Sequence, residues 1–207
     1  MAANDDSQHV LACRWRQTAS GPFFEIAEPP HEFKQALPAD YLAAVAAFGG
    51  REGFLGGVYL RLYRLQELVA LNIAYEVPSL LPEVIVFGSD GGGEAFAFLL
   101  GEAAVIRVPF LPLGPERAHR VARSFTEFVV SATDTGESAP YNTEAVGMEV
   151  HDKHPICLGG SPTDPANKVL VPPAKHADIC RLWNKVYRDA VSRQRRSAEP
   201  EDEGERG

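Results

Sequence analysis

The chain has 207 residues, a formal net charge of −8 and 45% hydrophobic residues, which predicts a globular protein with enough apolar side chains for a core. The negative charge disfavours nonspecific binding to nucleic acids or acidic membranes, and the apolar segments are too short for a membrane span. Three scattered cysteines are too few for a disulfide framework, and the N-terminus lacks the pattern of a signal peptide. We therefore expect a cytoplasmic protein that binds neither nucleic acid nor membrane.

The start of the chain predicts short strands followed by one helix. Residues 1–19 form an N-terminal segment that we expect to be partly disordered, with an edge strand at residues 10–16. A second short strand is predicted at residues 23–26. Apolar residues at helical spacing predict a helix over residues 41–48, which the following pair of glycines would end.

Residues 57–65 alternate between two faces, the pattern of a half-buried strand. The apolar face would carry Val58, Leu60 and Leu62. The opposite face would carry Tyr59, Arg61 and Tyr63. Residues 66–75 then predict a helix.

A hairpin is predicted at residues 82–98, which read PEVIVFGSDGGGEAFAF. Its first strand, residues 84–87, is apolar throughout, as in strands that are buried on both faces. The glycine-rich turn accepts positive φ, so the chain can reverse, and aromatic residues follow at alternate positions. The glycines could instead cradle a phosphate, but a following Lys-Ser/Thr pair and GxGxxG spacing are both missing. We therefore favour a plain turn.

The elements after the hairpin are predicted from short patterns. Residues 104–108 predict a strand, and the prolines of residues 109–115 predict a rigid loop. An apolar stripe predicts a helix over residues 116–132. Residues 134–145 are polar and contain glycine and proline, so we expect a linker there.

Residues 20–133 resemble the SUKH superfamily of Smi/Knr-like proteins. The resemblance is carried by the motifs LPADYLAAVAAFGG, GVYLRLYRLQEL, PEVIVFGSDGGGEAFAF, VPFLPLG and ARSFTEFV, together with Asn72 and Tyr75. It implies an α+β fold, in which helices flank a mixed or antiparallel sheet, and a protein-binding surface without enzymatic activity. Many members are bacterial immunity proteins that bind and neutralise polymorphic toxins.

The glycines that match this family are interpreted as structural turns. They are Gly49, Gly50, Gly91, Gly92 and Gly93. Asp90 matches the acidic position of the family's turn, and we favour a role in which its carboxylate bonds its own backbone. Asp90 and Glu94 are also the candidate partner-binding pair, because an acidic surface complements a basic toxin.

Residues 147–184 form a second region, which contains three of the six histidines. The predicted elements are strands at residues 148–156 and 168–171 and a helix at residues 174–190. On this helix His176 and Cys180 are i and i+4 and share a face. A strand-borne His151 could meet them and complete three zinc ligands, with the fourth position left to water. Such a site could hydrolyse phosphodiesters if a base stood beside the metal.

Residues 146–191 resemble the HNH, or ββα-metal, nuclease finger. The positions that match its pattern are His151, Pro155, Gly159, Gly160, Asn167 and His176. The resemblance implies that His151 is the metal-binding member of the family's histidine pair. It also places Cys180 where many members have another histidine. Asp152 falls where the general-base histidine should be, which argues against cleavage, and His154 has no role in this register.

A structural role for these side chains is the interpretation that we favour. Histidines beside Pro and Gly-Gly often bond buried carbonyls, and Cys180 could be a small core residue. The packing face of the helix would then carry Leu182, Trp183 and Val186. A bound metal without catalysis and a live nuclease are the two alternatives. The charged tail, residues 192–207, lacks apolar side chains and should be disordered.

We therefore predict a non-catalytic immunity protein without a cofactor, which binds and neutralises a cognate toxin, with nucleases among the candidate toxins. The competing enzyme hypothesis is a metal-dependent endonuclease, in which His151, His176 and Cys180 bind zinc. A general SUKH-like interaction module is the third hypothesis.

Overall fold

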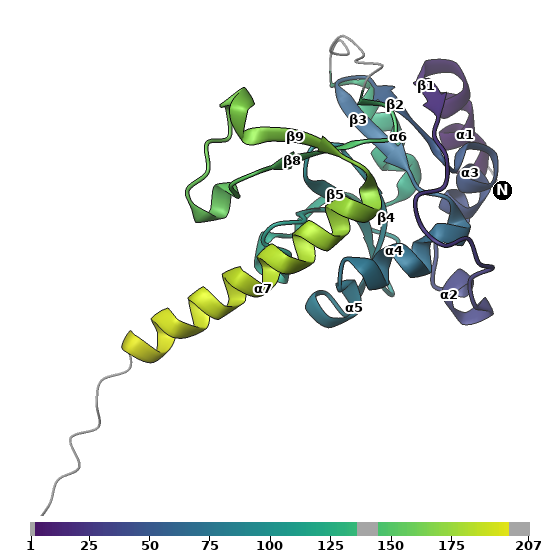
Figure 1. The fold of residues 1–207 in the computed structure, drawn as a ribbon. Helices are drawn as coiled ribbons and strands as arrows, with labels where there is room; N and C mark the ends of the chain where they lie inside the picture. Colours follow the sequence, from purple (N-terminus) through teal and green to yellow (C-terminus); the bar gives the residue numbers. More distant parts are fainter. Residues whose placement is uncertain (1–2, 136–144, 199–207) are drawn as a thin grey trace, which may run out of the picture.

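The computed structural model describes residues 3–135 and 145–198 and confirms the α+β prediction (Figure 1). Most of the predicted linker and the end of the predicted tail, residues 136–144 and 199–207, lie outside the described residues. One antiparallel sheet has seven strands, and each strand pairs with the next along the chain. The strands are β1 (Arg16–Ala19), β2 (Arg51–Leu55), β3 (Val58–Leu62), β4 (Val84–Ser89), β5 (Glu94–Leu99), β6 (Val105–Pro109) and β7 (His119–Ala122). A separate antiparallel pair consists of β8 (Glu149–Asp152) and β9 (Lys168–Val171).

The α-helices of the described ranges lie on both faces of the large sheet. They are α1 (Ala3–Arg14), α2 (His31–Gln35), α3 (Ala39–Phe48), α4 (Leu68–Ala74), α5 (Val77–Leu80), α6 (Phe125–Thr133) and α7 (Pro173–Ala198). None of these helices combines the length and the apolar character that a membrane span needs. The predicted helices at residues 41–48 and 66–75 and the predicted hairpin at residues 82–98 are all present.

One face of the sheet packs against α3 and α6 through aromatic side chains. The ring of Tyr41 in α3 lies 5.3 Å from the ring of Phe87 in β4, measured between centroids. The same ring lies 5.0 Å from Phe98 of β5 and 5.3 Å from Phe125 of α6. Full burial of side chains of this kind stabilises a fold by about 1.5–3 kcal/mol each. This layer is therefore a main source of hydrophobic stabilisation.

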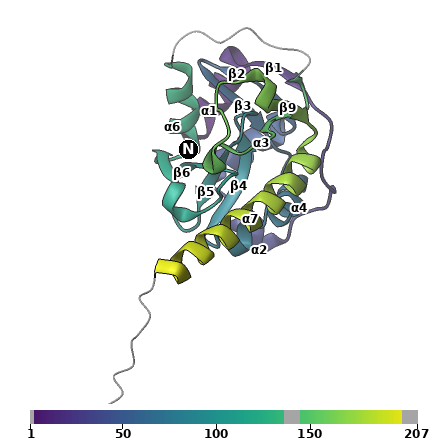
Figure 2. The same cartoon turned by 60° about the vertical axis from the view of Figure 1, so that its left-hand side comes forward.

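The opposite face is covered by α4 and by the finger, which consists of β8, β9 and α7. Figures 1 and 2 show α7 beside α4, with the C-terminal end of α7 projecting away from the sheet. Asn72 joins α4 to β4, because its side chain donates to the carbonyl of Val86 and accepts from the N–H of Val86, both at 2.9 Å. The helix is thus fixed to the sheet by both hydrogen-bonding groups of one amide.

Arg61 of β3 connects the sheet to the finger. Its Nη1 donates to Glu149 Oε1 of β8 at 2.6 Å, and its Nη2 donates to Glu52 Oε2 of β2 at 2.6 Å. All three side chains are at most 1% exposed. Tyr63 and Ser89 also donate their hydroxyls to Glu149 Oε1, at 3.1 and 2.8 Å. The prediction of a half-buried strand is therefore wrong. The finger buries the face of β3 that carries Arg61, and Glu149 of the finger provides the opposite charge.

The predicted edge strand at residues 10–16 is wrong. Helix α1 occupies most of this range, and β1 begins only at Arg16. Ser7 and Leu11 are i and i+4 on α1, and both are fully buried. Because α1 packs against α3 and α6, tertiary contacts decide the conformation of a segment with few apolar residues.

The predicted strand at residues 23–26 is also wrong, because this segment pairs with no neighbouring strand. The backbone N–H groups of Phe23 and Phe24 instead donate to Oε1 of Glu67, at 2.6 and 3.1 Å. Glu67 is buried. A single carboxylate thus satisfies two backbone donors that a strand would have paired with a carbonyl.

The helix predicted over residues 116–132 is correct only in its second half. The first half contains β7, whose Ala122 pairs with Val105 of β6. Ser124 then begins α6 as its N-cap, and its Oγ accepts from the N–H of Glu127 at 3.1 Å. The short apolar pattern fits a strand as well as a helix, so the cap residue was the better signal for the start of the helix.

Helix α7 continues to Ala198, so residues 192–198 of the expected disordered tail are helical. The predicted packing face is wrong for two residues, since Leu182 is 61% exposed and Val186 is 41% exposed. The buried face of α7 instead carries His176, Ala177, Cys180 and Asn184. The face of α7 that packs toward the sheet therefore carries two of the candidate metal ligands, His176 and Cys180.

Replacing Arg61 by methionine is expected to lower the free energy of unfolding by about 3–5 kcal/mol, because Glu52 and Glu149 would remain as buried, uncompensated carboxylates. Arg107→Met is the matched control. Arg107 also pairs with two carboxylates, near the β4–β5 turn, but its side chain is 47% exposed, so we expect a loss below about 1 kcal/mol. Chemical denaturation at neutral pH measures both values, and equal losses would contradict the role of the buried network.

Candidate metal centre

His151, His176 and Cys180 come together between the finger and the sheet. Side chains alternate along β8, so Glu149 and His151 face inward and are buried, while Asp152 is partly exposed. His176 and Cys180 are one turn apart near the start of α7, and both are buried. The strand and the helix therefore bring the three predicted ligands into one interior site.

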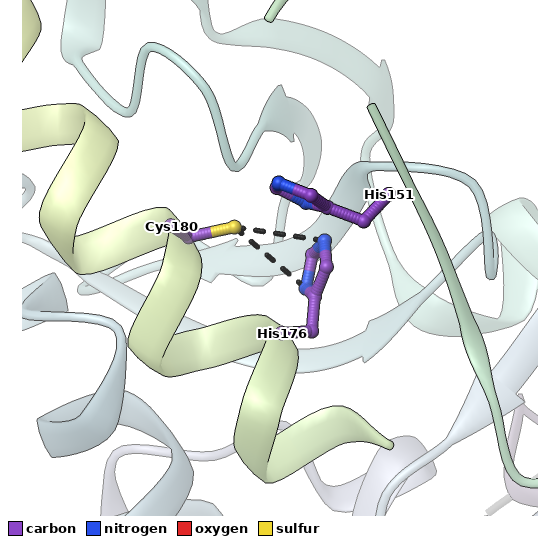
Figure 3. Close-up of side chains that lie close together, drawn as sticks. All are labelled: His151, His176 and Cys180. Carbon is purple, nitrogen blue, oxygen red and sulfur yellow. Dashed lines mark hydrogen bonds between the residues drawn. The ribbon is translucent and has the colours of Figure 1, made fainter. Parts of the chain in front are cut away.

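Figure 3 shows these three side chains converging from β8 and α7, and their donor atoms all lie within 4.8 Å of one another. Cys180 Sγ is 3.5 Å from His176 Nε2. The same sulfur is 3.7 Å from His176 Nδ1, which also lies 2.8 Å from Oη of Tyr75, the residue that directly follows α4. His151 Nε2 is buried and has no hydrogen-bond partner within the described part of the chain. This ring nitrogen, a potential metal ligand, is thus buried without a hydrogen bond to any described residue.

Burial sets the protonation state of the cluster. It lowers the pKa of His176 to about 3, with a smaller contribution from the neighbouring His151, and it also lowers the pKa of His151. Both imidazoles are therefore neutral at pH 7, which is the form that binds metal ions. Burial raises the pKa of the Cys180 thiol well above its ordinary value, and the carboxylate of Glu149 adds to this effect. The metal-free thiol is therefore neutral, whereas a bound cation would favour the thiolate.

The three side chains offer zinc two nitrogen ligands and one sulfur ligand, whose atoms all lie within 4.8 Å of one another. Zinc prefers nitrogen and sulfur ligands, and its bond lengths place two tetrahedral ligands roughly 3.3–3.6 Å apart. The distance of 3.5 Å between Cys180 Sγ and His176 Nε2 matches this value. The unpartnered Nε2 of His151 provides the third donor atom. A cavity of about 120 Å³ borders all three residues and leaves space for water at a fourth position.

The loop that joins β8 to β9 is held by Asn167, the residue that the resemblance matched to the asparagine of the HNH pattern. Its side chain accepts from the N–H of His154 at 2.8 Å and donates to the carbonyl of Ser161 at 2.9 Å. Gly160 lies against the same turn, where an added Cβ would be 1.8 Å from the carbonyl oxygen of His154. Pro155 is buried beside it. These matching positions shape the loop, and His154 takes part through its backbone.

Asp152 is the residue that the resemblance to the HNH pattern aligns with the general-base histidine. Its carboxylate forms an ion pair with Lys168 of β9, which faces it across the antiparallel pair. Asp152 also borders the cavity beside the three donor side chains. In place of the expected imidazole, the site therefore has a carboxylate that is already engaged by a lysine.

Asp90 and Glu94, the candidate partner-binding pair, lie at the β4–β5 turn. Asp90 Oδ1 accepts from the N–H groups of Gly92 and Glu94 at 2.8 and 3.0 Å, which is the turn role that we favoured. Arg107 of β6 pairs with both carboxylates, at 3.0 and 3.4 Å. The pair therefore presents a partly balanced acidic surface, and Asp90 also keeps the turn in shape.

The residues that attach this site to the sheet were not predicted from the sequence. Arg61 and Glu149 are 88 positions apart, and Tyr75 and His176 are 101 positions apart. The available signal was an arginine between two tyrosines on the supposedly solvated face of β3. A glutamate two positions before His151, on the same face of a strand, was its natural partner.

No family model and no curated protein matches the chain. The resemblances to the SUKH and HNH families therefore rest on the motifs quoted above. The metal-binding geometry does not depend on these resemblances, because it follows from the positions of three donor side chains and one unpartnered nitrogen.

The neutral state of His176 predicts a pH-dependent stability of the metal-free protein. The pKa of His176 in the folded state, about 3, is below the unfolded value of 6.5. The contribution of this group to the free energy of unfolding is therefore lost as the pH falls from about 6.5 toward 3. The loss should approach about 1.4 kcal/mol for each pH unit in that window. Denaturation in the presence of a chelator should therefore show that the stability difference between wild type and His176→Gln narrows as the pH is lowered. A difference that is independent of pH would contradict the buried, neutral imidazole.

Proposed function

We propose that the chain is a non-catalytic protein of the immunity type, which binds and neutralises a cognate toxin in the cytoplasm. The observation that carries the non-catalytic assignment is the ion pair between Asp152 and Lys168, at the position where a nuclease finger would hold its base. The likeness of residues 20–133 to SUKH proteins supports protein binding as the activity. The finger then serves as a scaffold for the domain that binds the toxin.

Size and charge also favour binding over cleavage. The cavity beside the candidate metal ligands measures about 120 Å³, whereas pockets for small molecules usually have about 300–1,000 Å³. The formal net charge of −8 opposes the phosphate backbone of DNA, which basic side chains must neutralise for binding. The same charge attracts a basic protein, such as a nuclease toxin, and would accelerate its association.

The acidic turn of the β4–β5 hairpin is the proposed contact surface. Asp90 and Glu94 are 19% and 31% exposed in their side chains, so their charges reach solvent while Arg107 restrains them. The finger supports this turn, because the N–H of Val150 in β8 donates to the carbonyl of Gly91 at 2.8 Å. A toxin that binds here would therefore meet a turn whose backbone is already fixed, which lowers the cost of ordering it.

Affinity capture of the tagged full-length protein from its native cells tests the proposal. We expect one dominant, stoichiometric protein partner, whose toxicity in a host cell is suppressed when this chain is expressed with it. Purified protein should leave plasmid DNA intact with zinc, magnesium or manganese. Recovery of nucleic acid and zinc without a protein partner, together with DNA cleavage, would refute the proposal.

Neutralising the acidic turn is expected to weaken partner binding at least tenfold, or about 1.4 kcal/mol. The double variant Asp90→Asn, Glu94→Gln keeps an oxygen acceptor at residue 90, so the turn can still form. The matched control is Glu28→Gln, Glu32→Gln, which changes the net charge equally at exposed positions elsewhere. Calorimetric titration with the captured partner measures both, and equal affinities for the two variants would place the contact surface elsewhere.

The second candidate function is a metal-dependent endonuclease, and the observation that favours it is the convergence of His151, His176 and Cys180. In that case zinc would supply an activated water, and His151, His176 and Cys180 would hold the ion. DNA cleavage by the wild type that is lost together with zinc in His176→Ala would establish this alternative. A variant Asp152→His would then be expected to increase cleavage, because it restores the side chain that the finger pattern expects.

A further inference from the structure

The candidate zinc ligands all belong to the finger, but the hydroxyl that contacts Nδ1 of His176 belongs to Tyr75 in the sheet region. Oη of Tyr75 lies 2.8 Å from His176 Nδ1, and both side chains are fully or almost fully buried. The ring of Tyr75 stacks on Phe110 at 4.2 Å, and Phe110 contacts the His176 ring edge-on at 5.3 Å. The hydroxyl is thus held toward Nδ1 by packing on both rings.

A neutral imidazole carries its proton on one nitrogen and offers a lone pair on the other. If Nδ1–H donates to Tyr75 Oη, the lone pair is on Nε2, which is 3.5 Å from Cys180 Sγ, while Nδ1 is 3.7 Å from the same sulfur. In the opposite tautomer Tyr75 donates to Nδ1, and Nε2 carries the proton. The first arrangement leaves a ligand atom for zinc, and the second does not.

We propose that Tyr75 is the positioning residue of a zinc site formed by His151, His176 and Cys180. Its hydroxyl accepts the proton of His176 Nδ1, which fixes the tautomer and the orientation of the ring so that Nε2 binds the metal. Outer partners of this kind typically change metal affinity by about 10–100-fold. Because Tyr75 follows α4 and the ligands lie on β8 and α7, the zinc site joins the sheet to the finger. This inference goes beyond the proposed toxin binding and does not depend on it.

The test compares zinc affinities of full-length variants by competition with a chromophoric chelator. Wild type should bind one zinc ion, His176→Ala should lose this binding, and Tyr75→Phe should bind about 10–100-fold more weakly. Tyr41→Phe is the matched control, because it removes the hydroxyl of another fully buried tyrosine, and that hydroxyl has no hydrogen-bond partner in the described residues. This control should retain the affinity of the wild type.

Nuclear magnetic resonance of the histidine ring nitrogens separates positioning from a general loss of stability. In the zinc-loaded wild type, His176 should carry its proton on Nδ1 and bind zinc through Nε2. The proposal is overturned if the wild type binds no zinc, if Tyr75→Phe binds zinc as tightly as the wild type, or if zinc is bound through Nδ1. None of these results bears on affinity for a protein partner, so the proposed function would be tested separately.

Discussion

The buried guanidinium of Arg61 is the interaction on which the arrangement of the two parts depends. It lies between Glu52 of its own sheet and Glu149 of the finger, and none of the three is more than 1% exposed. One cation facing two carboxylates in the interior needs further donors, and the hydroxyls of Tyr63 and Ser89 supply them to Glu149 Oε1, whereas Glu149 Oε2 has no partner in the described residues. The second face of the sheet is therefore interior only while the finger is docked.

Desolvation offsets much of the attraction within a buried ion pair, so such a pair adds little net stability to a fold. The aromatic layer around Tyr41 is the source of hydrophobic stabilisation, whereas the Arg61 network selects one position of β8. Glu149 and His151 are two residues apart on one face of that strand. The register that pairs Glu149 with Arg61 therefore also places His151 beside His176 and Cys180, and the candidate metal centre follows from a charge pairing outside it.

Local patterns predicted what local interactions decide. The β4–β5 hairpin follows from an apolar run and a glycine turn, and the meeting of His176 with Cys180 follows from helical spacing. Helix α1 and strand β7 were mispredicted because each contains few residues of clear periodicity, so packing and strand pairing decide their conformation. The contact of Tyr75 with His176 spans 101 positions, and such a pair has no local signature in one sequence.

The docked finger also reaches the proposed binding surface. Val150 lies between Glu149 and His151 on β8, and its N–H bonds the carbonyl of Gly91 in the turn that carries Asp90. The side chains on one face of β8 enter the ion-pair network and the metal centre, while its backbone supports the acidic turn. Because β8 takes part in all three, its register fixes the relative positions of the network, the candidate metal centre and the turn.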